Sequence, residues 1–503
     1  MNTANPSEWH SIGIVGAGAM GAGIAQVALA ADLTVYLYDA DSAALIRAKE
    51  QIKARLDRLE EKKQIGAGVA ARMLSSLKLA ASLSDLAGSQ VIIEAIVELL
   101  EAKQQLFSAL EQVVSADTLL ATNTSSLQVT AVSRTCNHRE RVFGMHFFNP
   151  VPLMKLVEII GGAETNGATL EAATGLARRL NKTPVRARDV PGFLVNLAGR
   201  AFATEALHIH HEGVADLATI DWIMRESVGF RMGPFELMDL TGIDVNFPAT
   251  RYIYEGFQQD PRLKTTLLHE SLFKAGRFGR KTGQGFHTYH ADGTRLEIPQ
   301  GVLSVLLPSD LPVVFLGQDN LHLQELAWKN LRVEAKDAPD LTILVAPVGE
   351  DASTVAARLN LDPSRTVAID FVGIDRKFLT LMGAIGAHQR ALRLADQLRA
   401  QGFRVATIRD SPGFVAPRIV SMIANLGCEI AQAGIGAPKD IDLAMRLAQN
   451  YPRGPLEWAE HLGAARTWQL LRELQEITGS DRYRPSLWLR RRALLNLSVY
   501  FQD

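Results

Sequence analysis

The chain has 503 residues, of which 47% are hydrophobic and 21% charged, and its 53 lysines and arginines almost balance its 54 acids. This composition is typical of a globular protein of two to four domains. A net charge of -1 gives no reason to expect nucleic acid or a membrane surface as a partner. The two cysteines, Cys136 and Cys428, are too few for a disulfide framework or a zinc site, so we expect no metal.

The chain starts with the polar segment MNTANPSEWH and runs directly into an apolar strand, so no secretory signal is visible. No apolar stretch reaches the ~20 residues that a membrane helix needs. We therefore expect a cytoplasmic protein with no membrane partner.

A glycine-rich turn joins the first predicted strand to the first predicted helix. The strand covers Ser11–Val15, the turn is Gly16-Ala17-Gly18-Ala19-Met20-Gly21, and the helix covers Ala22–Ala31. Glycines in this position let the backbone approach a pyrophosphate, and the helix N-terminus offers free N–H donors. The turn predicts a dinucleotide site, the alternative being a glycine-rich turn without a ligand.

The second predicted strand, Thr34–Tyr38, ends at Asp39. An acidic side chain at this distance from the turn meets the ribose hydroxyls of a dinucleotide. The same carboxylate would repel a 2′-phosphate, so the sequence favours NAD over NADP.

The long helix predicted over Asp41–Gln64 has a basic polar face. Such a face is usually only solvated, and the pattern alone leaves a ligand contact open. Its cations are Lys49, Lys53, Arg55, Arg58, Lys62 and Lys63.

Polar side chains follow the next two predicted strands. Strand Gln90–Ala95 leads into Glu98 and Lys103, and strand Thr118–Thr122 ends in Asn123-Thr124-Ser125-Ser126. An open α/β sheet keeps its ligand crevice at the carboxyl ends of its strands. The hydroxyl side chains there either bond a ligand or cap the next helix, and their position favours the ligand.

An apolar run places one histidine and one glutamate on two predicted strands, Val142–Phe148 and Leu153–Ile160, which Asn149-Pro150-Val151-Pro152 separates. Proline lacks the N–H that a sheet ladder needs, so these four residues predict a turn. If the strands are neighbours, the Glu158 carboxylate accepts from one nitrogen of His146 and leaves the other as a base. The pair is either a catalytic dyad or a histidine satisfied inside a sheet.

A helical region is expected after residue 189 and ends near residue 295. Asn196 lies in its first turns, where a buried amide either bonds a backbone group or faces a cleft. A glycine-rich loop that bears Lys281 closes the region. The expected helices are Leu194–Glu212, Leu217–Glu226 and Gly233–Leu240.

The helical region recurs at a fixed distance along the chain. Pro191-Gly192-Phe193 returns as Pro412-Gly413-Phe414, and Gly233-Pro234 as Gly454-Pro455, both at one offset in the numbering (412 − 191 = 221 and 454 − 233 = 221). A shared offset argues against chance. The segment 311–410 before the second copy has short strands but no glycine fingerprint, which indicates a degenerate α/β unit.

The second half does not keep the polar residues of the first half. We therefore expect one NAD site per chain, and we expect the second half to pack, dimerise or shape the substrate cleft. Aligned positions change from Asn196 to Pro417, from His146 to Asp370, and from Glu158 to Met382.

The motifs GAGAMGAGIAQVA, EAIVE, TNTSSL, GMHFFNPVPLMKLVEII, PGFLVN, GPFELMD and FGRKTGQGF occur in this order. Over about residues 10–290 the chain resembles the 3-hydroxyacyl-CoA dehydrogenase family. With its second helical domain it resembles the long bacterial members, which include the 3-hydroxybutyryl-CoA and 3-hydroxyadipyl-CoA dehydrogenases of phenylacetate breakdown.

The resemblance implies roles for the polar residues. His146 would be the general base and Glu158 its orienting partner, with Ser125 and Asn196 holding the oxygen on the acyl chain. Lys62 matches a family residue that meets CoA, and the neighbouring CoA position is Arg55, where aligned relatives have serine; an arginine suits a CoA phosphate. The NAD-contacting positions match Gly16, Ala17, Gly18, Ala19, Met20, Gly21, Asp39, Glu98, Lys103, Ser125, Asn149 and Lys281.

The expected fold is α/β plus all-α. A Rossmann-like NAD-binding domain (1–189) precedes a helical domain (190–295), a degenerate α/β unit (311–410) and a second helical domain (411–503). The resemblance also implies a homodimer with helical domains at the interface.

The expected activity is NAD-dependent oxidation of a (3S)-3-hydroxyacyl-CoA, short-chain or dicarboxylic, between the α/β and helical domains. A dehydrogenase of a free 3-hydroxy acid is one alternative, and a non-catalytic NAD-binding scaffold is another. Arg200, Arg225 and Arg231 are candidates for meeting a distal carboxylate, although surface arginine is the simpler interpretation of each.

Overall fold

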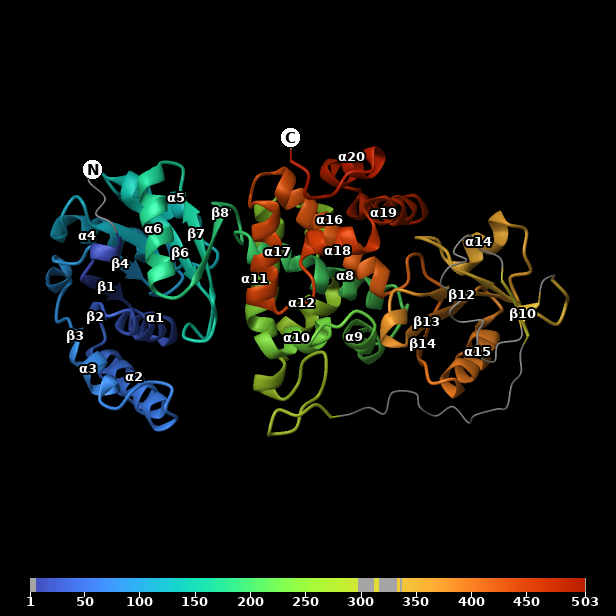
Figure 1. The fold of residues 1–503 in the computed structure, drawn as a ribbon, viewed down its shortest axis with the longest axis horizontal. Helices are drawn as coiled ribbons and strands as arrows, with labels where there is room; N and C mark the ends of the chain where they lie inside the picture. The colour runs from blue at the N-terminus through green and yellow to red at the C-terminus, as the bar shows by residue number, and fades with distance from the viewer. Residues whose placement is uncertain (1–5, 297–311, 316–332, 335–336, 503) are drawn as a thin grey trace. The chain divides into compact units, whose positions relative to one another are not determined.

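The computed structural model describes residues 6–296, 312–315, 333–334 and 337–502 (Figure 1). Two compact units account for the chain: unit 1 comprises Met1–Leu197 and Ala433–Gln449, and unit 2 comprises Ala198–Gln432 and Asn450–Asp503. Helix α17 (Pro438–Gln449), from the second helical copy, therefore belongs to unit 1. Among the described residues, no helix combines the length and the apolar character needed to cross a bilayer.

Unit 1 is built on an eight-stranded sheet with the order β3-β2-β1-β4-β5-β6-β7-β8. Neighbouring strands run parallel except β6 and β7, which are antiparallel. The order reverses between β1 and β4, which is where open sheets of this kind hold ligands. The strands are β1 (Ser11–Val15), β2 (Thr34–Tyr38), β3 (Leu77–Leu79), β4 (Val91–Glu94), β5 (Leu119–Thr122), β6 (Val142–Phe147), β7 (Leu156–Gly161) and β8 (Thr183–Arg188).

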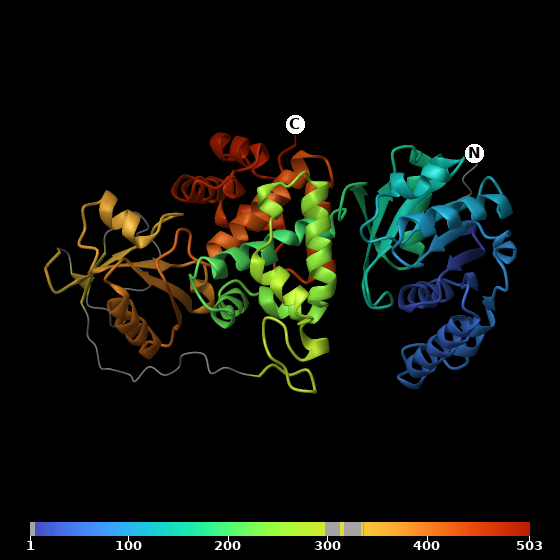
Figure 2. The same cartoon turned by 180° about the vertical axis from the view of Figure 1, so that it is seen from behind.

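Helices cover both faces of this sheet (Figures 1 and 2). Helices α1, α2, α3 and α6 share one apolar core with the strands. Asp41 and Asn166 cap α2 and α6, each accepting a backbone N–H of the first turn. The helices are α1 (Ala19–Ala30), α2 (Ser42–Glu61), α3 (Val69–Ser75), α4 (Leu100–Val113), α5 (Val129–Val132), α6 (Gly167–Arg179) and α7 (Val195–Ala198).

Two element boundaries differ from the sequence predictions. The helix predicted over 194–212 is interrupted at Gly199, a residue of low helix propensity, and continues as α8 (Arg200–His211). Strand β7 begins at Leu156 instead of residue 153, because the amides of Leu153 and Met154 bond the carbonyl of Pro150 and extend the turn.

Unit 2 contains most of both helical copies. Helix α16 is buried over almost its whole length and packs against α8, α18, α19 and α20. The helices of the first copy are α8, α9 (Leu217–Glu226), α10 (Pro234–Thr241), α11 (Ile243–Gly256) and α12 (Leu267–Lys274); those of the second are α16 (Ala416–Gln432), α18 (Pro455–Leu462), α19 (Ala464–Thr478) and α20 (Leu487–Leu495).

A buried ion cluster joins the two helical copies inside unit 2. Glu205 of α8 accepts from Arg418 Nε at 2.6 Å and from Arg482 Nε at 2.6 Å, and its side chain is fully buried. Burial opposes ionisation of Glu205, but the two guanidinium groups outweigh it and lower the pKa to about 2. The carboxylate is therefore ionised across the physiological pH range.

The second sheet of unit 2 has six strands in the order β10-β9-β11-β12-β13-β14. Only β12 and β13 pair antiparallel among its described strands. The parallel–antiparallel–parallel order of the last strands repeats that of β5 to β8, which confirms the predicted degenerate α/β unit. Its elements are β9 (Val313–Phe315), β10 (Val333–Glu334), β11 (Thr342–Val345), α14 (Ala352–Arg358), β12 (Thr366–Asp370), β13 (Phe378–Gly383), α15 (His388–Ala400) and β14 (Arg404–Ile408).

The strand register tests the predicted correspondence between the two sheets. His146 pairs with Glu158 across β6 and β7, whereas Asp370 pairs with Thr380 across β12 and β13. The prediction that Met382 corresponds to Glu158 is therefore wrong. The connection between the two antiparallel strands is two residues shorter in the second half. The offset in numbering that relates β6 to β12 therefore does not relate β7 to β13.

The repeat also extends to one backbone contact. In unit 1 the amide of Arg188 donates to the carbonyl of Ile435, and in unit 2 the amide of Arg409 donates to the carbonyl of Val214. The numbers of the two donor residues differ by the offset of the repeat (409 − 188 = 221), and so do those of the two acceptor residues (435 − 214 = 221). The end of each α/β part is thus bonded to the helical copy from the other half of the chain.

Candidate active site

The glycine turn of unit 1 has the geometry that a dinucleotide cradle needs. Gly16 has φ +105, and a Cβ added there would lie 2.4 Å from the carbonyl oxygen of Ala95. A Cβ on Gly21 would lie 1.8 Å from the carbonyl oxygen of Gly16. A Cβ on Gly18 would meet no atom within 4 Å, so the space in front of the N-terminus of α1 is open. This open space next to free helix N–H groups suits a pyrophosphate.

Asp39 follows β2 at the same edge of the sheet. Its Oδ2 accepts from the amide of Ala17 at 2.7 Å and its Oδ1 from the amide of Asp41 at 2.9 Å. The carboxylate is thereby fixed beside the glycine turn, where the ribose of a dinucleotide would lie.

Glu98 and Lys103 meet the hydroxyl cluster that follows β5. One oxygen of Glu98 accepts from the Thr124 hydroxyl at 2.6 Å and from the Ser125 amide at 2.9 Å, and the other lies 3.2 Å from Lys103 Nζ. Burial opposes ionisation of Glu98, but the Lys103 ammonium and the hydrogen bonds of Thr124 and Ser125 outweigh it and lower its pKa. The structure thus brings three of the sequence-predicted residues together.

Glu94 is a further member of this group that the sequence did not single out. It is fully buried at the end of β4, and its oxygens accept from Lys103 Nζ at 2.5 Å and from the Thr122 hydroxyl at 2.7 Å. Glu94 therefore fixes the ammonium group of Lys103, which in turn pairs with Glu98. An acid at the end of an apolar strand is the signal that could have identified it.

His146 and Glu158 are neighbours across β6 and β7, as the sequence predicted. The distance from His146 Nδ1 to Glu158 Oε2 is 2.6 Å, and Glu158 has no exposed surface. Its other oxygen, Oε1, accepts from the amides of Leu194 at 3.0 Å and Val195 at 2.9 Å. An acceptor-only carboxylate requires the proton on Nδ1, so Nε2 is left as the basic nitrogen.

Two phenylalanines flank the imidazole. The rings of Phe148 and Phe193 have centroids 4.5 Å and 5.9 Å from that of His146, and His146 itself is 5% exposed. Apolar neighbours keep water from the ring, while the Glu158 carboxylate fixes its orientation. The arrangement places an oriented base in a water-poor environment.

Ser125 and Asn196 also come together in unit 1. Asn196 Nδ2 donates to the backbone carbonyl of Ser125 at 3.4 Å. Between β5 and β6, the side chain of Asn123 accepts from the amide of Phe147 at 2.8 Å. That bond ties the hydroxyl cluster to the strand of the histidine, a role for Asn123 that sequence patterns did not reveal.

The loop that contains Asn149 is held by a buried lysine. Lys182 Nζ donates to the carbonyls of Val151 at 2.5 Å and Met154 at 2.8 Å, and burial lowers the pKa of this ammonium. Asn149 is exposed in the same loop. Sequence analysis missed Lys182, because a lone lysine before a strand carries no recognisable pattern.

The remaining predicted ligand residues are exposed or lie in unit 2. Arg55 and Lys62 are exposed on and after α2, available to a phosphate, whereas Lys53 pairs with Asp57 at 2.6 Å. Lys281 pairs with Asp244 within unit 2. A contact of Lys281 with NAD therefore stays a prediction from the resemblance.

The three arginines considered for a distal carboxylate have partners in unit 2. Arg225 pairs with Glu236 of α10, which also receives Arg295. Arg200 donates to the Thr250 hydroxyl at 2.7 Å, and Arg231 donates to Asn450 at 3.4 Å. Of these three partners, only that of Arg225 is a carboxylate.

Comparison with known proteins identifies the family. A family model described as 3-hydroxyacyl-CoA dehydrogenase, NAD binding domain, matches residues 11–190. A second, described as 3-hydroxyacyl-CoA dehydrogenase, C-terminal domain, matches residues 192–289 and again residues 413–497. The chain belongs to the 3-hydroxyacyl-CoA dehydrogenase family. The two C-terminal matches also confirm the predicted repeat of the helical region.

Some members of the 3-hydroxyacyl-CoA dehydrogenase family match nearly the whole chain, and others match about half of it. The 3-hydroxyadipyl-CoA dehydrogenase of Escherichia coli (strain K12) is 37% identical over 494 residues, which cover 97% of this chain and 98% of that protein. The mitochondrial hydroxyacyl-coenzyme A dehydrogenase of Sus scrofa is 37% identical over 286 residues, 55% of this chain and 90% of that protein. The second half of the chain is thus an addition to a scaffold that also occurs without it.

A solved structure matches the long form of the family. The crystal structure of 3-hydroxybutyryl-CoA dehydrogenase from Escherichia coli K12 substr. MG1655 has a TM-score of 0.87 and 37% identity, and covers 97% of this chain and 99% of that one. The predicted fold class is confirmed: a Rossmann-like α/β part and a helical part, followed by a reduced α/β part and a second helical copy. The NAD-binding family model likewise confirms the predicted cofactor.

Proposed function

We propose that this chain oxidises a (3S)-3-hydroxyacyl-CoA to the 3-oxoacyl-CoA and passes the C3 hydride to NAD. The observation that carries the proposal is the His146–Glu158 pair, 2.6 Å apart, with both carboxylate oxygens bonded and Nε2 left as a base. The pair occurs in a unit whose glycine turn and Asp39 suit a dinucleotide.

The proton chemistry is assigned to His146. Its Nε2 accepts the proton of the substrate 3-hydroxyl group as the C3–H bond breaks. Glu158 is buried and accepts from two amides, so its fixed carboxylate stabilises the imidazolium that forms and keeps Nδ1 protonated. Bound NAD supplies the hydride acceptor. In the reverse direction the same nitrogen returns the proton to the 3-oxo oxygen.

Ser125 and Asn196 are proposed to hold the oxygen that changes between hydroxyl and carbonyl. Both side chains carry a hydrogen-bond donor, and the Asn196 amide lies 3.4 Å from the Ser125 carbonyl. Two donors on the oxygen would stabilise the partial charge that develops during hydride transfer.

NAD is proposed to lie along the carboxyl ends of β1, β2 and β4. The glycine turn would take the pyrophosphate, Asp39 the ribose, and Glu98 with Lys103 the nicotinamide half. Ala17, Ala19 and Met20 complete the turn; Asn149 and Lys281 are the remaining proposed contacts, from the resemblance to the family.

The substrate class is proposed from the relatives. Two relatives that match 97% of the chain at 37% identity are named for 3-hydroxyadipyl-CoA and 3-hydroxybutyryl-CoA. These names support a short-chain or dicarboxylic thioester. A place in phenylacetate breakdown is proposed from the resemblance to the long bacterial members of the family. A cytoplasmic homodimer is also proposed; light scattering on the purified chain would measure the number of subunits.

The first experiment is NADH oxidation, followed by absorbance, with acetoacetyl-CoA as substrate. NADPH and free acetoacetate serve as controls. Rapid loss of NADH with the thioester alone is the expected result. Equal rates with free acetoacetate would favour a dehydrogenase of free 3-hydroxy acids. No turnover with short or dicarboxylic thioesters would favour a non-catalytic NAD-binding scaffold.

Lys62→Ala distinguishes the thioester from the free acid. We expect KM for acetoacetyl-CoA to rise about 5- to 20-fold, because an exposed cation that meets a phosphate contributes about 1–2 kcal/mol. The KM for NADH should not change. Lys49→Ala, at an exposed lysine of the helix that ends just before Lys62, is the matched control and should behave like the parent. An unchanged KM for the thioester would remove Lys62 from the CoA site.

A further inference from the structure

Residues 433–449 come from the second helical copy but belong to unit 1. They form a turn, residues 433–436, which is followed by helix α17. The helix packs against β7 and β8 of the eight-stranded sheet, and β7 carries Glu158. A short piece of the second half therefore lies against the strands of the proposed catalytic pair.

The 433–436 turn holds the end of β8. The amide of Arg188 donates to the carbonyl of Ile435 at 2.9 Å, and Nη1 of Arg188 donates to the carbonyl of Ala433 at 2.8 Å. Arg188 is the last residue of the strand. Both its backbone and its side chain are thus fixed by this turn.

The same turn also contacts Leu194. A Cβ added to Gly436 would lie 3.1 Å and 3.3 Å from the two methyl carbons of Leu194, so a side chain at this position would press on the leucine. Leu194 has no exposed surface, and its amide is one of the two donors to Glu158 Oε1. The contacts therefore run from Gly436 through Leu194 and Glu158 to His146.

The connection between Arg188 and Leu194 has an uncommon backbone conformation. Gly192 has φ 78 and Phe193 has φ 47, which are left-handed values that a bulky side chain rarely adopts. Such a conformation persists only where the surrounding structure holds it. The 433–436 turn contacts both ends of this connection, at Arg188 and at Leu194.

The second half keeps this support without the catalytic pair. In unit 2 the amide of Arg409 donates to the carbonyl of Val214, and Phe414 repeats the left-handed conformation with φ 56. Thr380 stands in the position of Glu158, and its hydroxyl group has no hydrogen-bond partner among the described residues. The support therefore belongs to the repeated scaffold, and in the first half a carboxylate is bonded to it.

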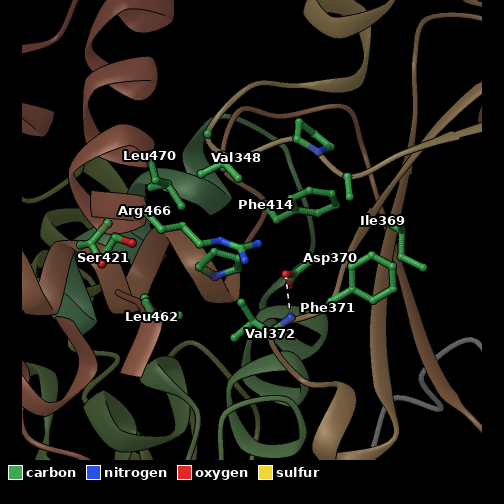
Figure 3. Close-up of a pocket in the computed structure, with 16 residues that line it drawn as sticks. Val348, Ile369, Asp370, Phe371, Val372, Phe414, Ser421, Leu462, Arg466 and Leu470 are labelled. Carbon is green, nitrogen blue, oxygen red and sulfur yellow. Dashed lines mark hydrogen bonds between the residues drawn. The ribbon is translucent and has the colours of Figure 1, made fainter. Parts of the chain in front are cut away.

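Figure 3 shows the pocket of unit 2 that corresponds to the surroundings of His146. Its lining includes Asp370 at the histidine position and Phe414, the counterpart of the phenylalanine at position 193. The Arg466 side chain extends toward the Asp370 carboxylate, which accepts from the amide of Val372 at 3.0 Å. The volume of about 20 Å³ is enough for a water molecule but not for a substrate, so this half has no site of its own to support.

We infer that the 433–436 turn positions the catalytic pair of unit 1 and that Gly436 is a positioning residue for His146. The inference rests on the proposed function, because it gives the turn a role in the proposed proton transfer. Since residue 436 has no side chain, Leu194 can place its amide 3.0 Å from Glu158 Oε1, and Glu158 in turn orients the imidazole. The second half of the chain thus takes part in catalysis through contacts within unit 1.

Gly436→Leu tests the inference. The new side chain would displace Leu194 and its amide, and a misplacement of about 1 Å can cost ~10²-fold in rate. We expect kcat with acetoacetyl-CoA to fall about 10- to 100-fold, and about 2- to 5-fold in the smaller variant Gly436→Ala. The KM for NADH should stay within about 3-fold, because the glycine turn is not touched. Ala437→Leu, at an exposed residue of the same segment, is the matched control and should behave like the parent.

A double-mutant cycle separates positioning from a general loss of packing. In a Glu158→Gln background, Gly436→Leu should change kcat by less than about 2-fold, since both changes disturb the same contact. Additive losses, or a folded Gly436→Leu variant with the kcat of the parent, would overturn the inference. If Gly436→Leu does not fold, the same cycle with Gly436→Ala decides. A parent protein inactive with every thioester would overturn the proposed function and this inference together, whereas additive losses in an active parent overturn the inference alone.

Discussion

The surroundings of His146 determine which of its two ring nitrogens can accept a proton from the substrate. Its Nδ1 lies 2.6 Å from Glu158 Oε2, and the other oxygen of Glu158 accepts hydrogen bonds from two backbone amides. Nδ1 therefore carries the proton of the neutral ring, and Nε2 is left as the acceptor. Without Glu158, the proton of the neutral imidazole could lie on either ring nitrogen. The proposed chemistry therefore belongs to the pair and to the amides of residues 194 and 195 that anchor it.

Replacement of the base tests this assignment. His146→Ala should lower kcat with acetoacetyl-CoA by about 10²- to 10⁴-fold, the contribution that a positioned acid–base group makes. Binding of NADH, measured by fluorescence titration, should stay within about 3-fold of the parent, because the imidazole is bonded to Glu158 and not to the glycine turn. His138→Ala, at an exposed histidine of the same unit, is the control. Turnover of His146→Ala within a few-fold of the parent would end the assignment.

At the scale of elements, one connection positions the predicted NAD contact Asn149. The turn between β6 and β7 is irregular, and its carbonyls at Val151 and Met154 are satisfied by the buried ammonium of Lys182. Unpaired carbonyls in such a place would cost about 1–3 kcal/mol each. One side chain at the start of β8 therefore determines how firmly the turn is held.

Lys182→Met should loosen this turn while keeping a side chain of similar length. We expect a loss of about 2–4 kcal/mol in the free energy of unfolding and a KM for NADH raised several-fold, since two carbonyls lose a charged donor. Urea denaturation and steady-state kinetics measure the two effects. Lys155→Met, at an exposed lysine beside the turn, should change neither. A variant as stable as the parent would show that water replaces the ammonium.

At the scale of the whole molecule, the second half keeps the fold and replaces the chemistry. Where the first half has a histidine bonded to a glutamate, the second has Asp370 paired across the sheet with Thr380. Burial raises the pKa of Asp370 to about 6, although the nearby Arg466 acts in the opposite direction. The structure thus tolerates a buried carboxyl group in a pocket that no longer has room for a substrate.

Asp370 should make stability depend on pH. Its folded pKa lies above the ordinary value of 3.8, so the folded state binds more protons than the unfolded state and its stability falls as pH rises. Between pH 5 and pH 7.5 this group alone should remove about 1 kcal/mol. Asp370→Asn should abolish that part of the slope in denaturant unfolding. Asp375→Asn, at an exposed aspartate, should keep it. An unchanged slope in Asp370→Asn would contradict the raised pKa.

The sequence placed His146 and Glu158 on two strands, and the register of β6 and β7 decided that they pair. The sequence by itself determined the order of elements, the dinucleotide turn and the repeat at an offset of 221. These features are local or periodic: glycines at fixed spacing, apolar runs that alternate with amphipathic ones, and motifs that recur. The family followed from the same motifs.

Only the tertiary structure decided how distant groups meet. It identified Glu94 and Lys182, whose roles depend on partners in other elements. It put Thr380 instead of Met382 in the position of Glu158, because a strand connection can shorten without a sequence signal. It also placed α17 with unit 1 and brought Arg466 to Asp370 in one pocket. Such contacts join residues far apart in the chain, and side-chain pairing across elements leaves no periodic trace in the sequence.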